Sequence, residues 1–195
     1  MTKKVTTKIM KNKNIKNLRH EMMYPFNRQP YSYSCGASCL ETVLTFFGFN
    51  VRESDVMKTA GTSPQEGTLV KGIIRVAKKY KLKYRIHENM VIDDLKDCID
   101  RNIPCMIAIQ AYRDNKQVKW EDDWKDGHWV VPIGYDSKYI HFEDPASQYR
   151  TFLSYSELNK RWHDIDTKDK KLVHFGISFY GRHKKFNEYE SVHMD

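Results

Sequence analysis

The apolar pattern of the chain changes character near residue 104, and this change restricts the fold more than any other feature. Before it, apolar residues recur at three- and four-residue steps, which is typical of helices with one buried face. The expected helices cover residues 36–47, 52–59, 68–80 and 93–101. After it come short segments rich in β-branched and aromatic residues: PCMIAIQAY, HWVVPIGYD, KYIHFEDP and KLVHFGISFY. Helices followed by strands predict an α+β domain with a mostly antiparallel sheet.

Residues at the ends of these segments refine the expectation. Gly48 can end the first helix, and Thr68 can cap the third. Ser154 and Glu157 match a capping box, so SYSELNKRWHD is expected to form a helix before the last strand. The YDSK turn joins HWVVPIGYD to KYIHFEDP and predicts an antiparallel hairpin centred on Asp136.

Positive charge is concentrated at the N-terminus. Of the formal net charge of +8, +7 lies in residues 1–20, which hold no acidic residue and are expected to form a poorly ordered tail. The remaining charge is nearly balanced, so no nucleic-acid partner is predicted. The chain shows neither a secretory signal nor a membrane span, and we expect a cytoplasmic protein. A length of 195 residues suits one domain, expected over 21–181, with a polar tail at 182–195.

Cys35 stands where a polar, aromatic turn, QPYSYS, meets the first helix. A cysteine in this place can be an inert core residue, a metal ligand or a nucleophile. The unpaired N–H groups of a helix start favour negative charge, and hence a reactive thiolate. Cys39 lies one turn further on, but no second close pair completes a metal site, and no metal is predicted. Cys39, Cys98 and Cys105 are expected to pack in the core.

His128 and Asp144 are the partners that a nucleophilic cysteine needs. His128 opens one apolar strand, and Asp144 ends the next strand, just before a proline. In a hairpin centred on Asp136 the two side chains lie directly opposite each other, so Asp144 can orient the imidazole while its other nitrogen faces Cys35. Singly, an ordinary histidine and a turn residue explain each position. Together with Cys35 they indicate nucleophilic catalysis.

Three segments carry a resemblance to a known family. QPYSYSCGASCLETVL resembles the catalytic segment of the double-glycine leader peptidases, which are papain-like cysteine proteases that mature bacteriocin precursors. GHWVVPIGYD and EDPA are similar to that family's histidine and aspartate motifs, in the same chain order. The resemblance implies a papain-like fold in which Cys35 is the nucleophile, His128 the general base and then acid, and Asp144 the residue that orients His128. It implies no cofactor.

The resemblance also assigns a role to Gln29, six positions before the cysteine. Its side-chain amide would donate to the oxyanion together with the backbone N–H of Cys35. The chain departs from the family at Ser34, where an acid often precedes the nucleophile. It also contains no membrane span and no nucleotide-binding loop of the exporters that carry many such domains.

Substrate-binding residues are expected at Gly36, Trp124 and Trp129. Gly36 leaves room beside the thiol for an extended backbone, which favours a small residue next to the scissile bond. The tryptophans belong to a loop that can either grip a substrate or be anchored to the core. Four acids of this loop would favour basic residues nearby in the substrate: Glu121, Asp122, Asp123 and Asp126.

We therefore expect a cysteine peptidase or amide hydrolase that acts on a peptide or other amide bond through an acyl-enzyme. Two alternatives remain open. The same residues serve an acyltransferase or amidase, because the residue pattern does not separate water from an amine as the acceptor. A catalytically idle peptide-binding module of the same fold is the alternative from a different class.

Overall fold

A computed structural model describes residues 20–22, 24, 25, 27–168 and 170–181, together with 186, 187, 189, 191, 193 and 194. The basic tail predicted over 1–20 lies outside the described residues except for His20, which belongs to β1 (His20–Glu21). The predicted tail at 182–195 is described only in part. Within it, the backbone N–H of Phe186 donates to the carbonyl of Phe46.

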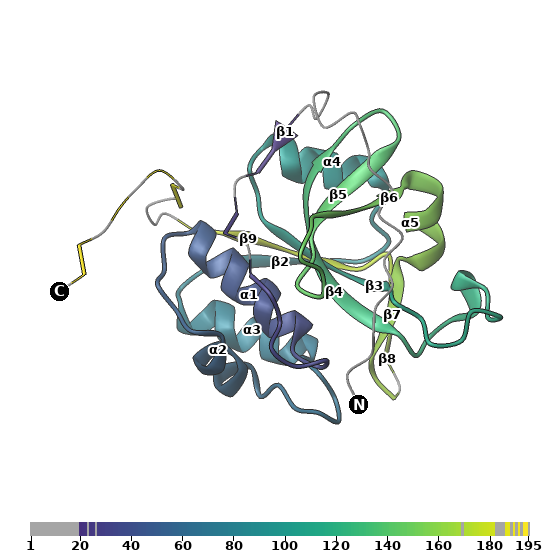
Figure 1. Ribbon diagram of the computed structural model, residues 1–195, viewed down its shortest axis with the longest axis horizontal. Coiled ribbons are helices and arrows are strands. Elements are labelled where there is room, and N and C mark those ends of the chain that lie inside the picture. The colour runs from purple at the N-terminus through teal and green to yellow at the C-terminus, as the bar shows by residue number, and fades with distance from the viewer. Residues whose placement is uncertain are drawn as a thin grey trace.

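The predicted helices and strands occur in the predicted order (Figure 1). The first half contains α1 (Cys35–Phe46), α2 (Glu53–Ala60), α3 (Val70–Lys79), β2 (Lys83–His87) and α4 (Ile92–Asp100). The second half contains β3 (Cys105–Gln110), the 3-10 helix η2 (Trp120–Asp122), β4 (Gly127–Tyr135), β5 (Tyr139–Glu143), β6 (Thr151–Ser154), α5 (Tyr155–Arg161), β7 (His163–Thr167), β8 (Lys170–Val173) and β9 (Gly176–Tyr180). β1, β2, β6 and β7 were not predicted, but the predicted α+β class is confirmed.

The strands of the main sheet pair in the order β2-β9-β3-β4-β5-β6, and β1 adds to β4. Every described strand pair is antiparallel, including the separate β7-β8 hairpin. β3 and β4 therefore lie in the interior of the sheet, where both of their faces can be covered. Antiparallel pairing of β3 with β4 brings the residues after Gln110 next to the start of β4.

Two hydrophobic cores cover the two faces of the sheet. Met106 and Ala108 of β3 pack with the apolar residues of α1, α2 and α3. Their neighbours Ile107 and Ile109 pack with those of α4 and α5. Successive side chains of a strand point to opposite faces, so a strand buried on both faces has the continuous apolar run seen in CMIAI. Figure 1 shows the two helix groups on opposite sides of the sheet.

Two element boundaries differ from the sequence prediction. α5 keeps the predicted capping box of Ser154 and Glu157 but ends at Arg161, and the following residues form β7. The predicted final strand is divided into β8 and β9. At this break His174 adopts a positive φ of 46°, which interrupts an extended backbone.

The predicted cap of α3 is wrong. The N-cap residue is Leu69, and the hydroxyl of Thr68 is hydrogen-bonded to that of Thr62 at 2.7 Å. The backbone N–H of Val70 instead donates to Oδ1 of Asp166 at 2.7 Å. A carboxylate from distant β7 thus satisfies a helix N–H that a local side chain was expected to satisfy.

The hairpin of β4 and β5 is antiparallel as predicted, but its register is shifted. Oδ1 of Asp136 accepts hydrogen bonds from the backbone N–H groups of Lys138 and Tyr139, which closes a longer turn. Val131 therefore pairs with Glu143, and a bulge follows between Pro132 and Gly134.

Asp144 directly follows Glu143, the partner of Val131, so it lies one residue beyond the last pair of this register and not opposite His128. The predicted direct opposition of His128 and Asp144 is therefore wrong. A displacement of two residues keeps side chains on the same face, so the two become diagonal neighbours and still meet.

No helix in the described part of the chain is both long and apolar enough to cross a membrane.

Candidate functional site

Cys35 is the first residue of α1, and the turn before it is held locally. The N-cap residue Ser34 does not cap the helix with its side chain, because its hydroxyl donates to the carbonyl of Tyr31 at 3.1 Å. The first turn also contains no acidic residue. The helix N-terminus therefore keeps its positive end free to stabilise negative charge at the Cys35 sulfur.

His128 connects Cys35 with Asp144. Its Nε2 lies 2.8 Å from Oδ1 of Asp144, and the Cys35 thiol lies close enough to the same imidazole to help raise its pKa. The three residues are only 8%, 6% and 4% exposed for Cys35, His128 and Asp144 respectively. The structure thus brings together the three residues that the sequence proposed, in a place where water competes weakly for their hydrogen bonds.

Asp144 is fully engaged as an acceptor. Besides His128, Oδ1 accepts from the backbone N–H of Ala146 at 3.0 Å. Oδ2 accepts from the hydroxyl of Tyr112 at 2.5 Å and from that of Thr151 at 3.0 Å. These four hydrogen bonds hold the carboxylate in one orientation, and through it the imidazole.

Opposite charges set the ionisation of the pair. Burial would lower the pKa of His128, but the charge and hydrogen bond of Asp144, with a contribution from Cys35, raise it well above its ordinary value. Burial would raise the pKa of Asp144, but His128 and the hydrogen bond from Tyr112 lower it. An imidazolium facing a carboxylate is therefore the favoured state near neutral pH.

Gln29 is tied to both sides of the site. Its backbone N–H donates to the carbonyl of Pro145 at 2.9 Å, which joins it to the turn after Asp144. Its side-chain Nε2 donates to the carbonyl of Tyr31 at 2.8 Å, in the turn before Cys35. A side-chain amide carries two N–H groups, so one remains after this bond.

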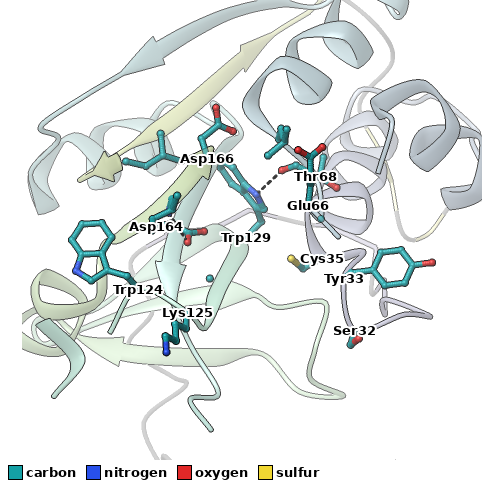
Figure 2. A pocket seen from close by; sticks show the side chains of 15 residues that line it. Ser32, Tyr33, Cys35, Glu66, Thr68, Trp124, Lys125, Trp129, Asp164 and Asp166 are labelled. Atoms are coloured by element: carbon teal, nitrogen blue, oxygen red, sulfur yellow. Dashed lines mark hydrogen bonds between the residues drawn. The ribbon is translucent and has the colours of Figure 1, made fainter. Parts of the chain in front are cut away.

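A pocket that is partly open to solvent lies beside Cys35 (Figure 2). Its volume is about 270 Å³. Its walls come from the turn before α1, the segment before α3, the start of β4 and the β7-β8 hairpin: Ser32, Tyr33, Cys35, Glu66, Gly67, Thr68, Leu69, Trp124, Lys125, Gly127, Trp129, Asp164, Ile165, Asp166 and Leu172. Figure 2 shows Cys35 and Tyr33 on one side of this space and Asp164 and Trp124 on the other.

The expected substrate-binding residues fall in different places. Trp124 lines the pocket, and its ring packs 4.4 Å from that of His163. Trp129 also lines the pocket and donates from Nε1 to the carbonyl of Thr68 at 3.1 Å. Gly36 is buried, and a Cβ there would lie 2.7 Å from Cβ of Thr68 and 2.9 Å from Cδ1 of Trp129. Close packing accounts for this glycine, and its role toward substrate stays a prediction.

Three of the four acids of the tryptophan loop have partners of their own. Oδ1 of Asp123 accepts from the backbone N–H of Lys125, and Oδ2 of Asp126 accepts from that of Asp114. Glu121 lies 3.9 Å from the ammonium of Lys160. These acids stabilise the loop, and none belongs to the pocket wall described above.

The other cysteines are buried. The thiol of Cys39 donates to the carbonyl of Trp129 at 3.2 Å, and burial raises its pKa well above the ordinary range. Among the residues that the structure describes, no group of three or more His, Cys, Asp or Glu side chains is arranged to hold a metal ion.

The model of the peptidase C39 family matches residues 23–166, a span that includes Cys35, His128 and Asp144. The chain belongs to the peptidase C39 family. It is 32% identical over 119 residues to an uncharacterised protein of Methanothermobacter marburgensis, a match that covers 61% of this chain and 70% of that protein.

Solved structures of C39 peptidases share the fold of this C39 family member. A C39-like peptidase from Bacillus anthracis aligns with a TM-score of 0.63 at 18% identity, covering 82% of this chain and 96% of that one. The peptidase domain of Streptococcus ComA, a bifunctional ABC transporter, aligns with a TM-score of 0.61 at 20% identity, covering 82% and 100%. A double-glycine motif protease from an AMS/PCAT transporter, in complex with the leader peptide, aligns with a TM-score of 0.57 at 20% identity. This alignment covers 83% of this chain and 94% of that one. The predicted papain-like fold and family resemblance are confirmed.

Sequence reasoning missed several residues of this C39 site. Tyr112 and Thr151 reach Asp144 from the end of β3 and the start of β6. The register of β3 with β4 pairs Ile109 with His128, so a side chain a few residues after Ile109, such as Tyr112, lies near the imidazole. Asp164 was predicted to end the helix SYSELNKRWHD, and nothing in the sequence indicated that it would line the pocket.

Glu143, the neighbour of Asp144 on β5, gives a stability prediction. It is 2% exposed, and burial, helped by the charge of Asp144, raises its pKa to about 7 from the ordinary 4.5. Between these pH values the folded protein keeps a proton that the unfolded chain has released, so stability falls as pH rises through this window. Glu143→Gln should remove about 2 to 3 kcal/mol of this decline. Urea unfolding at pH 5 and pH 8 tests it, and parallel curves for wild type and variant would contradict it.

Proposed function

We propose that the chain is a cysteine peptidase that cleaves a peptide bond through an acyl-enzyme on Cys35. The observation that carries the proposal is the buried chain of contacts from the Cys35 sulfur through His128 to Asp144, at the mouth of a pocket. A thiolate beside an imidazolium at a helix N-terminus is the activated form of a cysteine nucleophile. Family membership supports a peptidase-like function in the same direction.

The residues have separate roles in this mechanism. The Cys35 thiolate attacks the substrate carbonyl carbon and forms a tetrahedral oxyanion. His128 donates its proton to the leaving amine as the C–N bond breaks, which leaves a thioester on Cys35. His128 then takes a proton from water, whose oxygen attacks the thioester and releases the acid and the thiolate. Asp144 holds the imidazole in the required orientation throughout.

The oxyanion needs hydrogen-bond donors. We assign this role to the backbone N–H of Cys35 and to the Gln29 side chain, whose position beside the turn before α1 supports it. Loss of one such donor commonly costs about 3 kcal/mol of transition-state stabilisation.

A peptide substrate is supported by a structural neighbour, a double-glycine motif protease that was solved with a leader peptide bound. The test is digestion of a peptide library by the wild type and by Cys35→Ala, with products identified by mass spectrometry. Cleavage only by the wild type supports the proposal, and cleavage by neither protein would contradict it. Adding a primary amine separates hydrolysis from acyl transfer, because transfer yields amide products of the added amine.

Tyr112 should tune this mechanism through Asp144. Its hydroxyl donates to Oδ2, and its ring lies 5.6 Å from that of His128 in an edge-to-face arrangement. Tyr112→Phe removes one of four hydrogen bonds to the carboxylate and should lower kcat roughly 3- to 10-fold with little change in KM. Tyr149→Phe, at an exposed tyrosine, is the matched control and should leave kcat unchanged. An unchanged kcat in Tyr112→Phe would mean that the other three bonds suffice.

A further inference from the structure

The pocket beside Cys35 carries more negative than positive charge. Three of its lining residues are acids, Glu66, Asp164 and Asp166, against the single ammonium of Lys125. Within the described part of the chain, none of these three acids forms an ion pair with a basic side chain. The acids of the pocket are therefore not held in ion pairs with basic side chains of the described residues.

Asp164 is the acid most firmly built into this pocket. Its Oδ1 accepts hydrogen bonds from Nε2 of Gln110 at 3.2 Å and from the backbone N–H of Ile165 at 2.8 Å. Its Oδ2 accepts no hydrogen bond from the residues that the structure describes. Figure 2 shows this side chain on the side of the pocket opposite Cys35. One oxygen thus anchors the group and the other is left for a ligand.

The backbone is shaped to admit this carboxylate. A Cβ at Gly127 would lie 2.2 Å from Oδ1 and 2.4 Å from Oδ2 of Asp164, so only glycine allows the group to sit there. Gly127 directly precedes His128, which places Asp164 beside the strand that carries the imidazole. Asp166 lies two residues further along β7, and its Oδ1 already accepts a hydrogen bond from the backbone N–H of Val70. Asp164 is therefore the better placed of the two to receive a ligand.

The walls suit an organic cation. Trp124, Trp129 and Tyr33 present aromatic surface to the pocket. Aromatic faces attract ammonium and guanidinium groups and also pack against aliphatic stems. The Trp124 ring already has the ammonium of Lys171 4.4 Å from its centroid. A pocket of about 270 Å³ is smaller than the pockets that enclose whole small ligands, and this size favours one side chain.

We propose that this pocket binds a lysine or arginine side chain of the peptide substrate, and that Asp164 is the residue that determines this preference. The inference rests on the proposed peptidase function and names its specificity. It relocates the expected preference for basic residues from the acids of the tryptophan loop to the acids of the pocket.

The test uses pairs of peptides derived from a sequence that the wild type cleaves. Each pair has lysine or its neutral analogue norleucine at one position, and both ends are blocked so that no α-ammonium competes. Burial raises the pKa of Asp164 to about 7, so assays at pH 8 keep it largely ionised. At one position near the scissile bond, lysine should give a kcat/KM roughly 10-fold or more above norleucine, because only the lysine ammonium can pair with the carboxylate of Asp164.

Three variants locate the preference. Asp164→Asn should lower kcat/KM for the lysine peptide roughly 10-fold, mainly through KM, while the norleucine peptide changes less than about 3-fold. Glu66→Gln, at the exposed side of the pocket, should act in the same direction with a smaller effect. Asp122→Asn, in η2 outside the pocket, should leave both peptides unchanged. An unchanged melting temperature and Cys35 alkylation rate establish that Asp164→Asn is folded with an intact thiol.

Two results separate the specificity from the function. Equal cleavage of lysine and norleucine peptides by the wild type, or an equal loss for both in Asp164→Asn, overturns the assignment of Asp164 and leaves the peptidase intact. If no peptide is cleaved, the peptidase proposal fails, and a binding measurement then tests whether the pocket prefers a basic side chain. In that case tryptophan fluorescence of Cys35→Ala, titrated with N-acetyl-lysine amide and with N-acetyl-norleucine amide, should report tighter binding of the lysine derivative, and equal binding overturns the inference.

Discussion

Replacing His128 with alanine is expected to lower kcat/KM for a cleaved peptide roughly 10⁴-fold or more. Two functions are lost together in this variant. The imidazolium that pairs with the Cys35 thiolate disappears, and so does the proton that the leaving amine requires. Steady-state kinetics on one defined peptide measure the loss.

The control for His128→Ala is chemical rescue. Added imidazole can occupy the space of the missing ring and should restore part of kcat, because Asp144 remains in place with its three other hydrogen bonds. His128→Gln, which retains more of the side-chain volume, guards against an effect of unfolding. A variant that keeps activity within about 10-fold of the wild type would show that another group transfers the proton.

Replacing Asp144 with alanine is expected to lower kcat roughly 10²- to 10³-fold and to lower the melting temperature. The imidazole loses the carboxylate that fixes its orientation and raises its pKa. Tyr112, Thr151 and the N–H of Ala146 lose their acceptor at the same time. Each buried donor left without a partner costs about 1 to 3 kcal/mol, so stability falls as well.

Asp144→Asn is the matched variant that separates charge from shape. The amide oxygen can accept from His128 and Ala146, and the hydroxyls of Tyr112 and Thr151 can turn to accept from its nitrogen. We expect a folded protein whose kcat is roughly 10-fold or more below that of the wild type. This fall is smaller than in Asp144→Ala, because only the charge is lost. Equal kcat values for wild type and Asp144→Asn would show that another residue orients His128.

Local patterns predicted much of the fold. The apolar period placed α1 and the strand texture placed β3, β4 and β5 within a few residues, because these elements are buried and their side chains follow the geometry of the element. The hairpin register was wrong by two residues, since the side chain of Asp136 closes a longer turn than YDSK suggests. Because side chains alternate with a period of two, that error left His128 and Asp144 on one face.

Contacts between distant segments could not be predicted in this way. Asp166 of β7 accepts a hydrogen bond from the first turn of α3, although Thr68 was the cap that the sequence predicted. Asp164 lies in HDIDT, which continues directly from the predicted helix SYSELNKRWHD with no glycine or proline between them. Neither β7 nor the place of Asp164 in the pocket could therefore be inferred. The preference of a side chain for water is a local property, whereas its neighbours across the sheet depend on the complete fold.

The most direct test of the account is the rate at which Cys35 reacts with iodoacetamide at pH 6, followed by peptide mapping. An ordinary thiol is protonated at this pH and reacts slowly, whereas a thiolate held by an imidazolium reacts fast. We predict that Cys35 is modified at least roughly 10-fold faster than Cys39, Cys98 or Cys105 in the folded protein, and that His128→Ala abolishes the difference. Equal rates for all four cysteines, or a Cys35 rate that does not depend on His128, would contradict the central claim that Cys35 is an activated nucleophile.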